Sequence, residues 1–115
     1  MSIKRIESGA RMSQAVVANG FVFLAGQVAP DPSGDVVSQT RQVLGEIDRL
    51  LAAAGTRKDR ILSATIYLAD VSTFAEMNRA WEAWVPADAK PARATVEAKL
   101  VAPEYRVEIQ VVALV

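Results

Sequence analysis

Two stretches near the C-terminal end contain charged and polar residues whose types could support chemistry. They form two alternating rows, Arg93, Thr95 and Glu97 in the first stretch and Arg106, Glu108 and Gln110 in the second. Alternation places each row on one face of a β-strand. A guanidinium can hold a carboxylate through two parallel hydrogen bonds, and a carboxylate can orient water or move a proton.

Alternation alone does not locate an active site. Polar rows are common on solvent-exposed strands, and Arg93 and Glu108 could instead form an ordinary surface ion pair, which would contribute little stability. If Val107 and Ile109 face the core, we expect Glu108 to point to the opposite side of its strand.

Composition narrows the chemistry that the chain can perform. The 115 residues include no histidine and no cysteine, which excludes Ser-His and Cys-His pairs, thiolate metal sites and disulfides. Catalysis would have to use carboxylates, arginine, hydroxyls, backbone amides or bound water. The formal net charge is zero, which argues against a protein that binds nucleic acid electrostatically. We therefore expect no thiolate or histidine metal site and no nucleic-acid partner.

The remaining pattern predicts one domain, residues 1–115, of the α+β class. We expect strands at 4–7, 14–17 and 21–27, a helix at 35–54, a strand at 61–68, a helix from Asp70 or Ser72 to just before Pro86, and strands at 91–98 and 104–114. Asn19-Gly20 is typical of a tight hairpin turn, and Gly55 of a helix C-terminus. This order favours a mixed sheet with two helices on one face.

The strand segment 21–25 is apolar on both sides, which indicates burial on both faces. Two helices can cover only one face of the sheet, so we infer a homo-oligomer in which the sheets face one another. The alternative is a central strand partly covered by loops.

The sequence resembles the RidA/YjgF family (reactive intermediate deaminases, also called endoribonuclease L-PSP). Four segments match in the same order along nearly the whole chain: Ala25-Gly26-Gln27, Ala75-Glu76-Met77-Asn78, the run from Pro91-Ala92-Arg93 to Val101, and Val107-Glu108-Ile109. The resemblance implies a chorismate-mutase-like fold and a homotrimer with pockets between subunits. It further implies that Arg93 binds a substrate carboxylate, that Glu108 lies near an attacking water, and that Gly26 and Asn78 line the pocket.

The family resemblance implies cofactor-free hydrolysis of 2-aminoacrylate and other enamines or 2-imino acids to 2-keto acids and ammonia. Such compounds hydrolyse spontaneously, so the enzyme must mainly position them. This chain departs from many active members, which have tyrosine, serine and cysteine where it has Met12, Ala25 and Thr95. Met12 would make the pocket more apolar, and Arg11 or Ser13 could supply replacement polar contacts. The Arg11-Met12-Ser13 start and the 77–84 stretch are closer to a YoaB-like subgroup.

Two other functions remain open. The first is a non-catalytic trimer that senses or carries a small carboxylate through Arg93, which the substitutions in the pocket favour. The second is the ribonuclease or translation-inhibitor activity attributed to some relatives, which the neutral charge and lack of histidine argue against. Trp81 and Trp84 could form a stacking platform, but their spacing beside Met77 favours core or interface positions. No signal peptide or membrane-spanning run is evident, so we expect a cytoplasmic protein.

Overall fold

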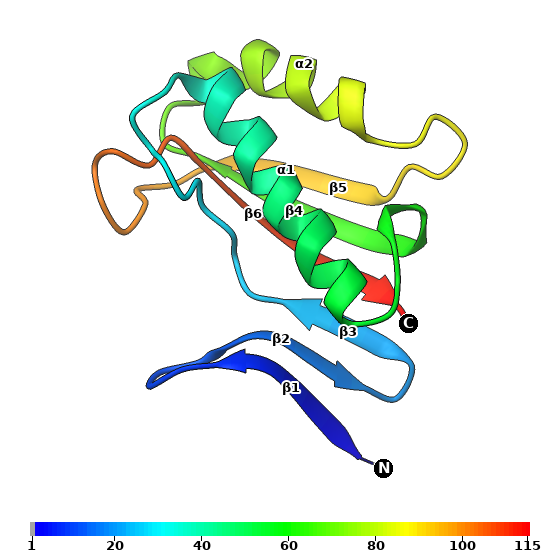
Figure 1. The fold of residues 1–115 in the computed structure, drawn as a ribbon. Helices are drawn as coiled ribbons and strands as arrows, with labels where there is room; N and C mark the ends of the chain where they lie inside the picture. The colour runs from blue at the N-terminus through cyan, green and yellow to red at the C-terminus, as the bar shows by residue number, and fades with distance from the viewer. Residues whose placement is uncertain (1) are drawn as a thin grey trace.

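The computed structural model describes residues 2–115, which form a six-stranded sheet covered on one face by two helices (Figure 1). The elements in chain order are β1 (Ile3–Ser8), β2 (Ser13–Ala18), β3 (Phe21–Leu24), α1 (Val36–Ala53), η1 (Lys58–Arg60), β4 (Ile61–Leu68), η2 (Val71–Thr73), α2 (Phe74–Trp84), β5 (Ala92–Glu97) and β6 (Val107–Leu114). The α+β class and the predicted order of strands and helices are confirmed. None of the helices in residues 2–115 is long and apolar enough to cross a membrane.

The strand order across the sheet is β1-β2-β3-β6-β4-β5. β4 and β5 run parallel, with α2 connecting them, and all other neighbours are antiparallel. The consecutive strands β5 and β6 are therefore not adjacent, because β4 lies between them. This arrangement decides how the two polar rows predicted from the sequence are related.

The core lies between the helices and the sheet. Asp35 begins α1 by accepting a hydrogen bond from the Ser38 amide (2.9 Å), and Gly55 follows the helix with a φ of 84°, the left-handed conformation that glycine adopts readily. The buried stripe of α1 packs over the sheet residues that face it, and both sets are mainly apolar, with Gln39 and Thr40 as buried polar residues of the helix. The largest fully buried side chains include Leu24, Leu44, Ile47, Leu50, Leu51, Ile66, Leu68, Met77 and Ile109.

Two predicted strand boundaries are wrong by three residues, and the other strand ends agree to within one residue. β3 ends at Leu24 rather than at residue 27, and Gln27 forms only an isolated bridge, exchanging two backbone hydrogen bonds with Ile109. β6 begins at Val107 rather than at residue 104. The buried side chain of Gln39 accepts a hydrogen bond from the Arg106 amide (2.9 Å), so this part of the chain is held by a side chain before sheet pairing begins.

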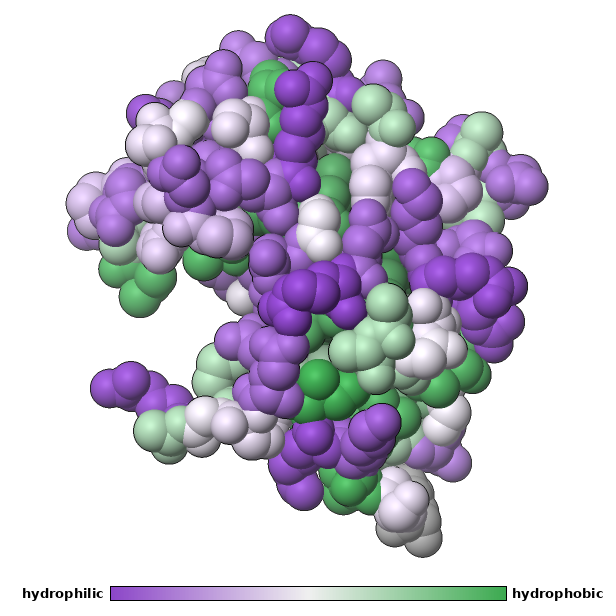
Figure 2. Space-filling view, viewed as in Figure 1, coloured by the Kyte–Doolittle hydropathy of each residue, from purple (hydrophilic) through white to green (hydrophobic). Residues whose placement is uncertain are grey.

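The face of the sheet away from the helices is uncovered within a single chain, and we call it the open face. It includes Phe23, Tyr67, Val96, Glu108 and Val112, as the strand registers require. On β3, Val22 and Leu24 are buried under the helices, whereas the ring of Phe23 is 46% exposed. The segment between β5 and β6 and the turn between β1 and β2 project to the same side, and the surface is hollowed between them (Figures 1 and 2).

Candidate functional site

Arg93 extends from β5 to the helix side of the sheet, where side chains of α2 contact it. It pairs in register with Ala64, a buried residue under the helices. Its Nη1 donates a hydrogen bond to Oδ1 of Asn78 (2.8 Å), and its guanidinium carbon lies 5.7 Å from the ring centroid of Phe74 and 5.3 Å from that of Trp81. The guanidinium is thus held by neutral groups, and no acid of the described chain forms an ion pair with it.

The local structure of α2 explains this arrangement. Phe74, Asn78 and Trp81 recur at steps of four and three residues, so they lie along one side of the helix. Desolvation by burial lowers the pKa of the Arg93 guanidinium, and the charge of Glu82 acts in the opposite direction. Arginine remains charged through such a shift, so Arg93 is a partly desolvated cation with unused donors.

Thr95 follows Arg93 on the same face of β5. Its hydroxyl oxygen is buried and has no hydrogen-bond partner among the described residues. Buried hydroxyls in folded proteins nearly always have a partner, so an unpaired one next to a predicted binding residue is informative. It leaves a donor and an acceptor available two residues from Arg93.

Glu108 lies on the open face, opposite in register to Tyr67, and is partly buried. The prediction that it points away from the core is confirmed, because Val107 and Ile109 are fully buried on the helix side. Glu108 borders a cavity of about 300 Å³. The other residues lining this cavity are Gly26, Tyr67, Ala98, Lys99, Leu100, Val101 and Gln110.

Gly26 makes room for the Glu108 carboxylate. A Cβ atom built on Gly26 would lie 2.1 Å from Oε2 of Glu108 and 2.9 Å from its carboxyl carbon. Any larger residue would therefore occupy the space in which the carboxylate now lies. The absence of a side chain on Gly26 allows Glu108 to lie against the backbone just after the end of β3.

Arg93 and Glu108 lie on opposite faces of the sheet. Arg93 shares a face with Ala64, and Glu108 shares the other face with Tyr67 and Val96, because directly paired residues on neighbouring strands point to the same side. The Arg93–Glu108 ion pair considered from the sequence is therefore absent from residues 2–115. The two side chains cannot act on one small molecule within a single chain.

The other predicted pocket residues lie near the turn between β1 and β2 and after β3. Met12 is 47% exposed and borders a shallow cavity of about 270 Å³, different from the one beside Glu108. The Ser13 hydroxyl is paired with that of Ser8 at 2.7 Å. The Ala25 amide donates to the carbonyl of Gln14 (2.9 Å), next to Gly26. A single chain thus does not bring Met12 and Ser13 together with Arg93.

Phe74 and Trp81 are contacts of Arg93 that the sequence interpretation missed. Trp81 was interpreted as a core or interface residue, and it is buried, but its ring also faces the guanidinium. Trp84 has a structural role, since its Nε1 donates to Asp48 (2.9 Å) and its carbonyl accepts from Lys58 (2.7 Å). The sequence contains a signal for the role of Phe74, because this residue precedes Asn78 by about one turn on a predicted helix.

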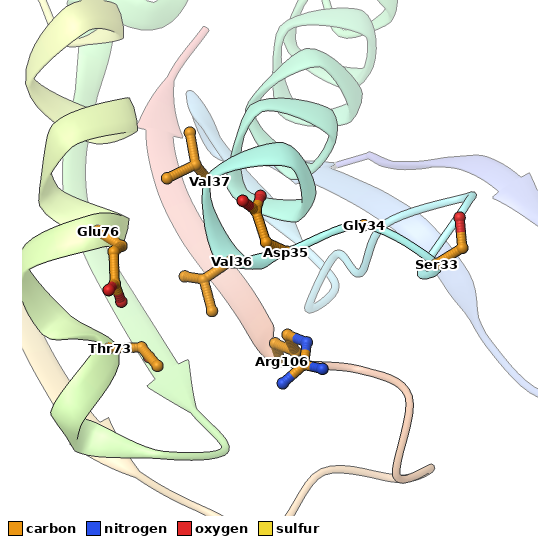
Figure 3. Close-up of a pocket in the computed structure, with 8 residues that line it drawn as sticks. All are labelled: Ser33, Gly34, Asp35, Val36, Val37, Thr73, Glu76 and Arg106. Carbon is orange, nitrogen blue, oxygen red and sulfur yellow. The ribbon is translucent and has the colours of Figure 1, made fainter.

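A further cleft lies between the start of α1 and the region around the start of α2, with a volume of about 380 Å³ (Figure 3). Figure 3 shows Asp35, Glu76 and Arg106 around it, and none of the residues predicted for the site lines it. Asp35 is already engaged as the N-cap of α1. Residues 2–115 also contain no cluster of three or more acidic, histidine or cysteine side chains that could hold a metal ion.

Comparison with known proteins gives matches over nearly the whole chain. A family model described as "Endoribonuclease L-PSP" matches residues 2–115. The chain is 45% identical over 115 residues to the RutC family protein YoaB of Escherichia coli strain K12, with both chains fully covered. It belongs to the YjgF/RutC family.

Other members of the YjgF/RutC family are equally similar. A RutC family protein of Haemophilus ducreyi is 47% identical over 113 residues, covering 98% of this chain and 97% of that protein. The crystal structure of a YjgF family member from Neisseria meningitidis has a TM-score of 0.97 and 47% identity, covering 99% of this chain and 95% of that one. The family resemblance inferred from the sequence is confirmed.

Proposed function

We propose that this protein is a cofactor-free hydrolase that converts reactive enamines and 2-imino acids, such as 2-aminoacrylate, to 2-keto acids and ammonia. The observation that carries the proposal is the state of Arg93. Its guanidinium is partly buried against two aromatic rings and an amide, without a carboxylate of its own chain. A desolvated cation without an internal counter-ion is well suited to bind an external carboxylate.

Arg93 provides the first half of the site. Asn78 occupies one of its Nη donors, and the others can bind both oxygens of a substrate carboxylate in parallel, which lysine could not reproduce. The Thr95 hydroxyl, buried and unpaired, can donate or accept a hydrogen bond beside it. Asn78 acts through Arg93 in this arrangement, because its side-chain oxygen holds the guanidinium.

Glu108 provides the second half. Its carboxylate accepts a proton from water as the water oxygen adds to the C=N carbon, and it passes this proton to nitrogen, which gives a carbinolamine. It then transfers the hydroxyl proton of the carbinolamine to nitrogen as the C–N bond breaks and ammonia leaves. An enamine such as 2-aminoacrylate first gains a proton at carbon and loses one from nitrogen, which converts it to the imine. The oxygen of the 2-keto acid comes from water, and the C=N bond is broken without redox chemistry. Gly26 holds the carboxylate against the strand end, where the cavity admits a small molecule.

A site that contains both residues requires two copies of the chain, since Arg93 and Glu108 lie on opposite faces of one sheet. One copy contributes the edge strand β5 with Arg93, and its neighbour contributes the open face with Glu108. Such a head-to-tail contact uses different surfaces on the two partners, and it forms a ring when the rotation between successive copies closes. We assign the ring as a homotrimer, in which the neighbouring subunit covers the open face and the exposed Phe23 and Val96 become buried.

The second candidate is a trimer that binds small carboxylates without turnover. It is favoured by the residues near the expected pocket that supply no side-chain hydrogen bond, Met12 and Ala25. It shares the Arg93 site with the hydrolase, and it predicts saturable binding of 2-keto acids without faster imine decay. The two candidate functions are therefore distinguished only by catalysis, which is measured as faster decay of the imine.

The decisive assay couples an amino-acid oxidase to the protein and traps the remaining imine with semicarbazide. The wild-type protein should reduce the trapped product, and Arg93→Lys and Glu108→Gln should each remove most of this effect. Arg106→Lys is the matched control, because Arg106 is exposed and borders a different cleft. A wild-type protein that binds 2-keto acids but leaves the trapped product unchanged would replace the hydrolase by the binding protein.

A complementation experiment tests the shared site directly. Arg93→Ala and Glu108→Gln chains are each inactive in the proposal, but a co-refolded equal mixture contains interfaces with one intact residue from each chain. Random assembly should restore about one quarter of the wild-type sites. Recovery of no activity from well-folded mixed trimers would show that the two residues do not meet across an interface.

A further inference from the structure

Phe74 and Trp81 bracket the Arg93 guanidinium along one side of α2. The guanidinium carbon of Arg93 lies 5.7 Å from the ring centroid of Phe74 and 5.3 Å from that of Trp81. Asn78, which lies between these two residues on the helix, accepts a hydrogen bond from Nη1 of Arg93. The bracket restrains a long side chain that otherwise loses considerable rotamer entropy on binding.

The two rings differ in exposure. Trp81 is 6% exposed and belongs to the core, whereas Phe74 is 42% exposed at the start of α2. Val71, three residues earlier, is also exposed, so two exposed apolar side chains lie at this end of α2. Glu97 is the acid nearest in sequence on the same face of β5, and its carboxylate accepts from the Val71 amide (3.0 Å).

Building on the function proposed above, we infer that Phe74 both positions Arg93 and selects the substrate side chain. The ligand class is a 2-imino or 2-keto monocarboxylate with an aliphatic or aromatic side chain. The carboxylate lies on the guanidinium, and the side chain covers the exposed part of the Phe74 ring. A second carboxylate on the ligand would meet the apolar surface and the negative charge of Glu97, so dicarboxylates are disfavoured.

The test measures binding of stable 2-keto acids to the intact protein by calorimetry. The series is pyruvate, 2-oxobutanoate and 4-methyl-2-oxopentanoate, with 2-oxoglutarate as the charged comparison. Burial of each added methylene against Phe74 should tighten wild-type binding by up to about fourfold. Phe74→Ala should flatten this series and weaken pyruvate binding about threefold to tenfold, while Phe74→Tyr should retain both properties.

Two controls distinguish positioning from a general structural effect. The Arg93 Nε–H resonance should be displaced by the ring currents in the wild-type protein and in Phe74→Tyr, and should move toward its ordinary position in Phe74→Ala. Trp84→Phe is the matched aromatic substitution on the same helix, since the Trp84 ring contacts Lys58 and Trp81 rather than Arg93. It should leave both the series and the resonance unchanged.

The inference is overturned by a flat wild-type series, by tighter binding of 2-oxoglutarate, by no detectable 2-keto acid binding, or by a Phe74→Ala protein that binds as the wild type does. These outcomes are distinguishable from failure of the proposed hydrolase. A protein without imine hydrolysis that still shows the graded series retains the Phe74 assignment. A protein with hydrolysis but no dependence on the side chain loses it.

Discussion

Replacement of Gly26 by alanine should remove activity without unfolding the protein. The new Cβ would lie 2.1 Å from Oε2 of Glu108, and an ordinary contact begins near 3.4 Å, so the carboxylate must retreat by about 1.3 Å. Misplacement of a catalytic group by about 1 Å can reduce a rate by about 100-fold, and we expect a loss of that order in imine hydrolysis.

The stability of the Gly26→Ala protein should change little. The clash is with the end of a flexible side chain that can rotate away, and the φ angle of Gly26 is not in the left-handed region that disfavours alanine. Alanine also lowers the entropy of the unfolded chain, which favours folding by about 0.4–1 kcal/mol. The melting temperature should therefore be maintained or slightly raised while the semicarbazide assay reports the loss of rate.

Two further variants make this prediction specific. Gly45→Ala is the control, because nothing lies within 4 Å of its added Cβ on α1, and it should stabilise the helix by about 1 kcal/mol with full activity. Glu108→Asp in the Gly26→Ala background shortens the side chain by one methylene and should recover part of the lost rate. Full activity of Gly26→Ala alone would refute the role of the glycine in holding Glu108.

Three other substitutions test the framework around the site. Gln39→Leu should lower the free energy of unfolding by about 3 kcal/mol in urea titrations, because the buried amide donates to three carbonyls and accepts from the Arg106 amide. Asp35→Ala should cost about 1 kcal/mol in the same titration, since it removes the cap on the Ser38 amide. Phe23→Glu should convert the trimer to monomers in light scattering and abolish hydrolysis, because it places a charge in the proposed interface.

The fold could largely be predicted from local patterns. The apolar stripe of α1, the Asp35 cap and the glycine at its end are interactions between residues close in sequence, and the predicted helix differs from the observed one by a single residue at each end. β4 was predicted with its observed limits, Ile61–Leu68, from its β-branched residues and its alternation, although the pairing with β6 is irregular between Ile61 and Ser63.

The start of β6 and the contacts of Arg93 could not be predicted in the same way. Residues 104–106 read as part of a strand, but the Gln39 side chain, 67 positions from Arg106, holds them outside the sheet. A pattern within one strand contains no information about a buried amide from a distant helix. For Arg93, the spacing of Phe74 and Asn78 gave their common side of α2, but not that this side covers β5.

The relation between the two polar rows depends on sheet topology rather than on either strand. β5 and β6 are consecutive in the sequence, which makes an ion pair between Arg93 and Glu108 a natural expectation. Because β4 separates the strands and the register places the two residues on opposite faces, each charge lies away from the other. The face with Arg93 is completed by α2, and the face with Glu108 is left open. A site that uses both charges therefore depends on association of the chains, so loss of assembly and loss of catalysis should occur together.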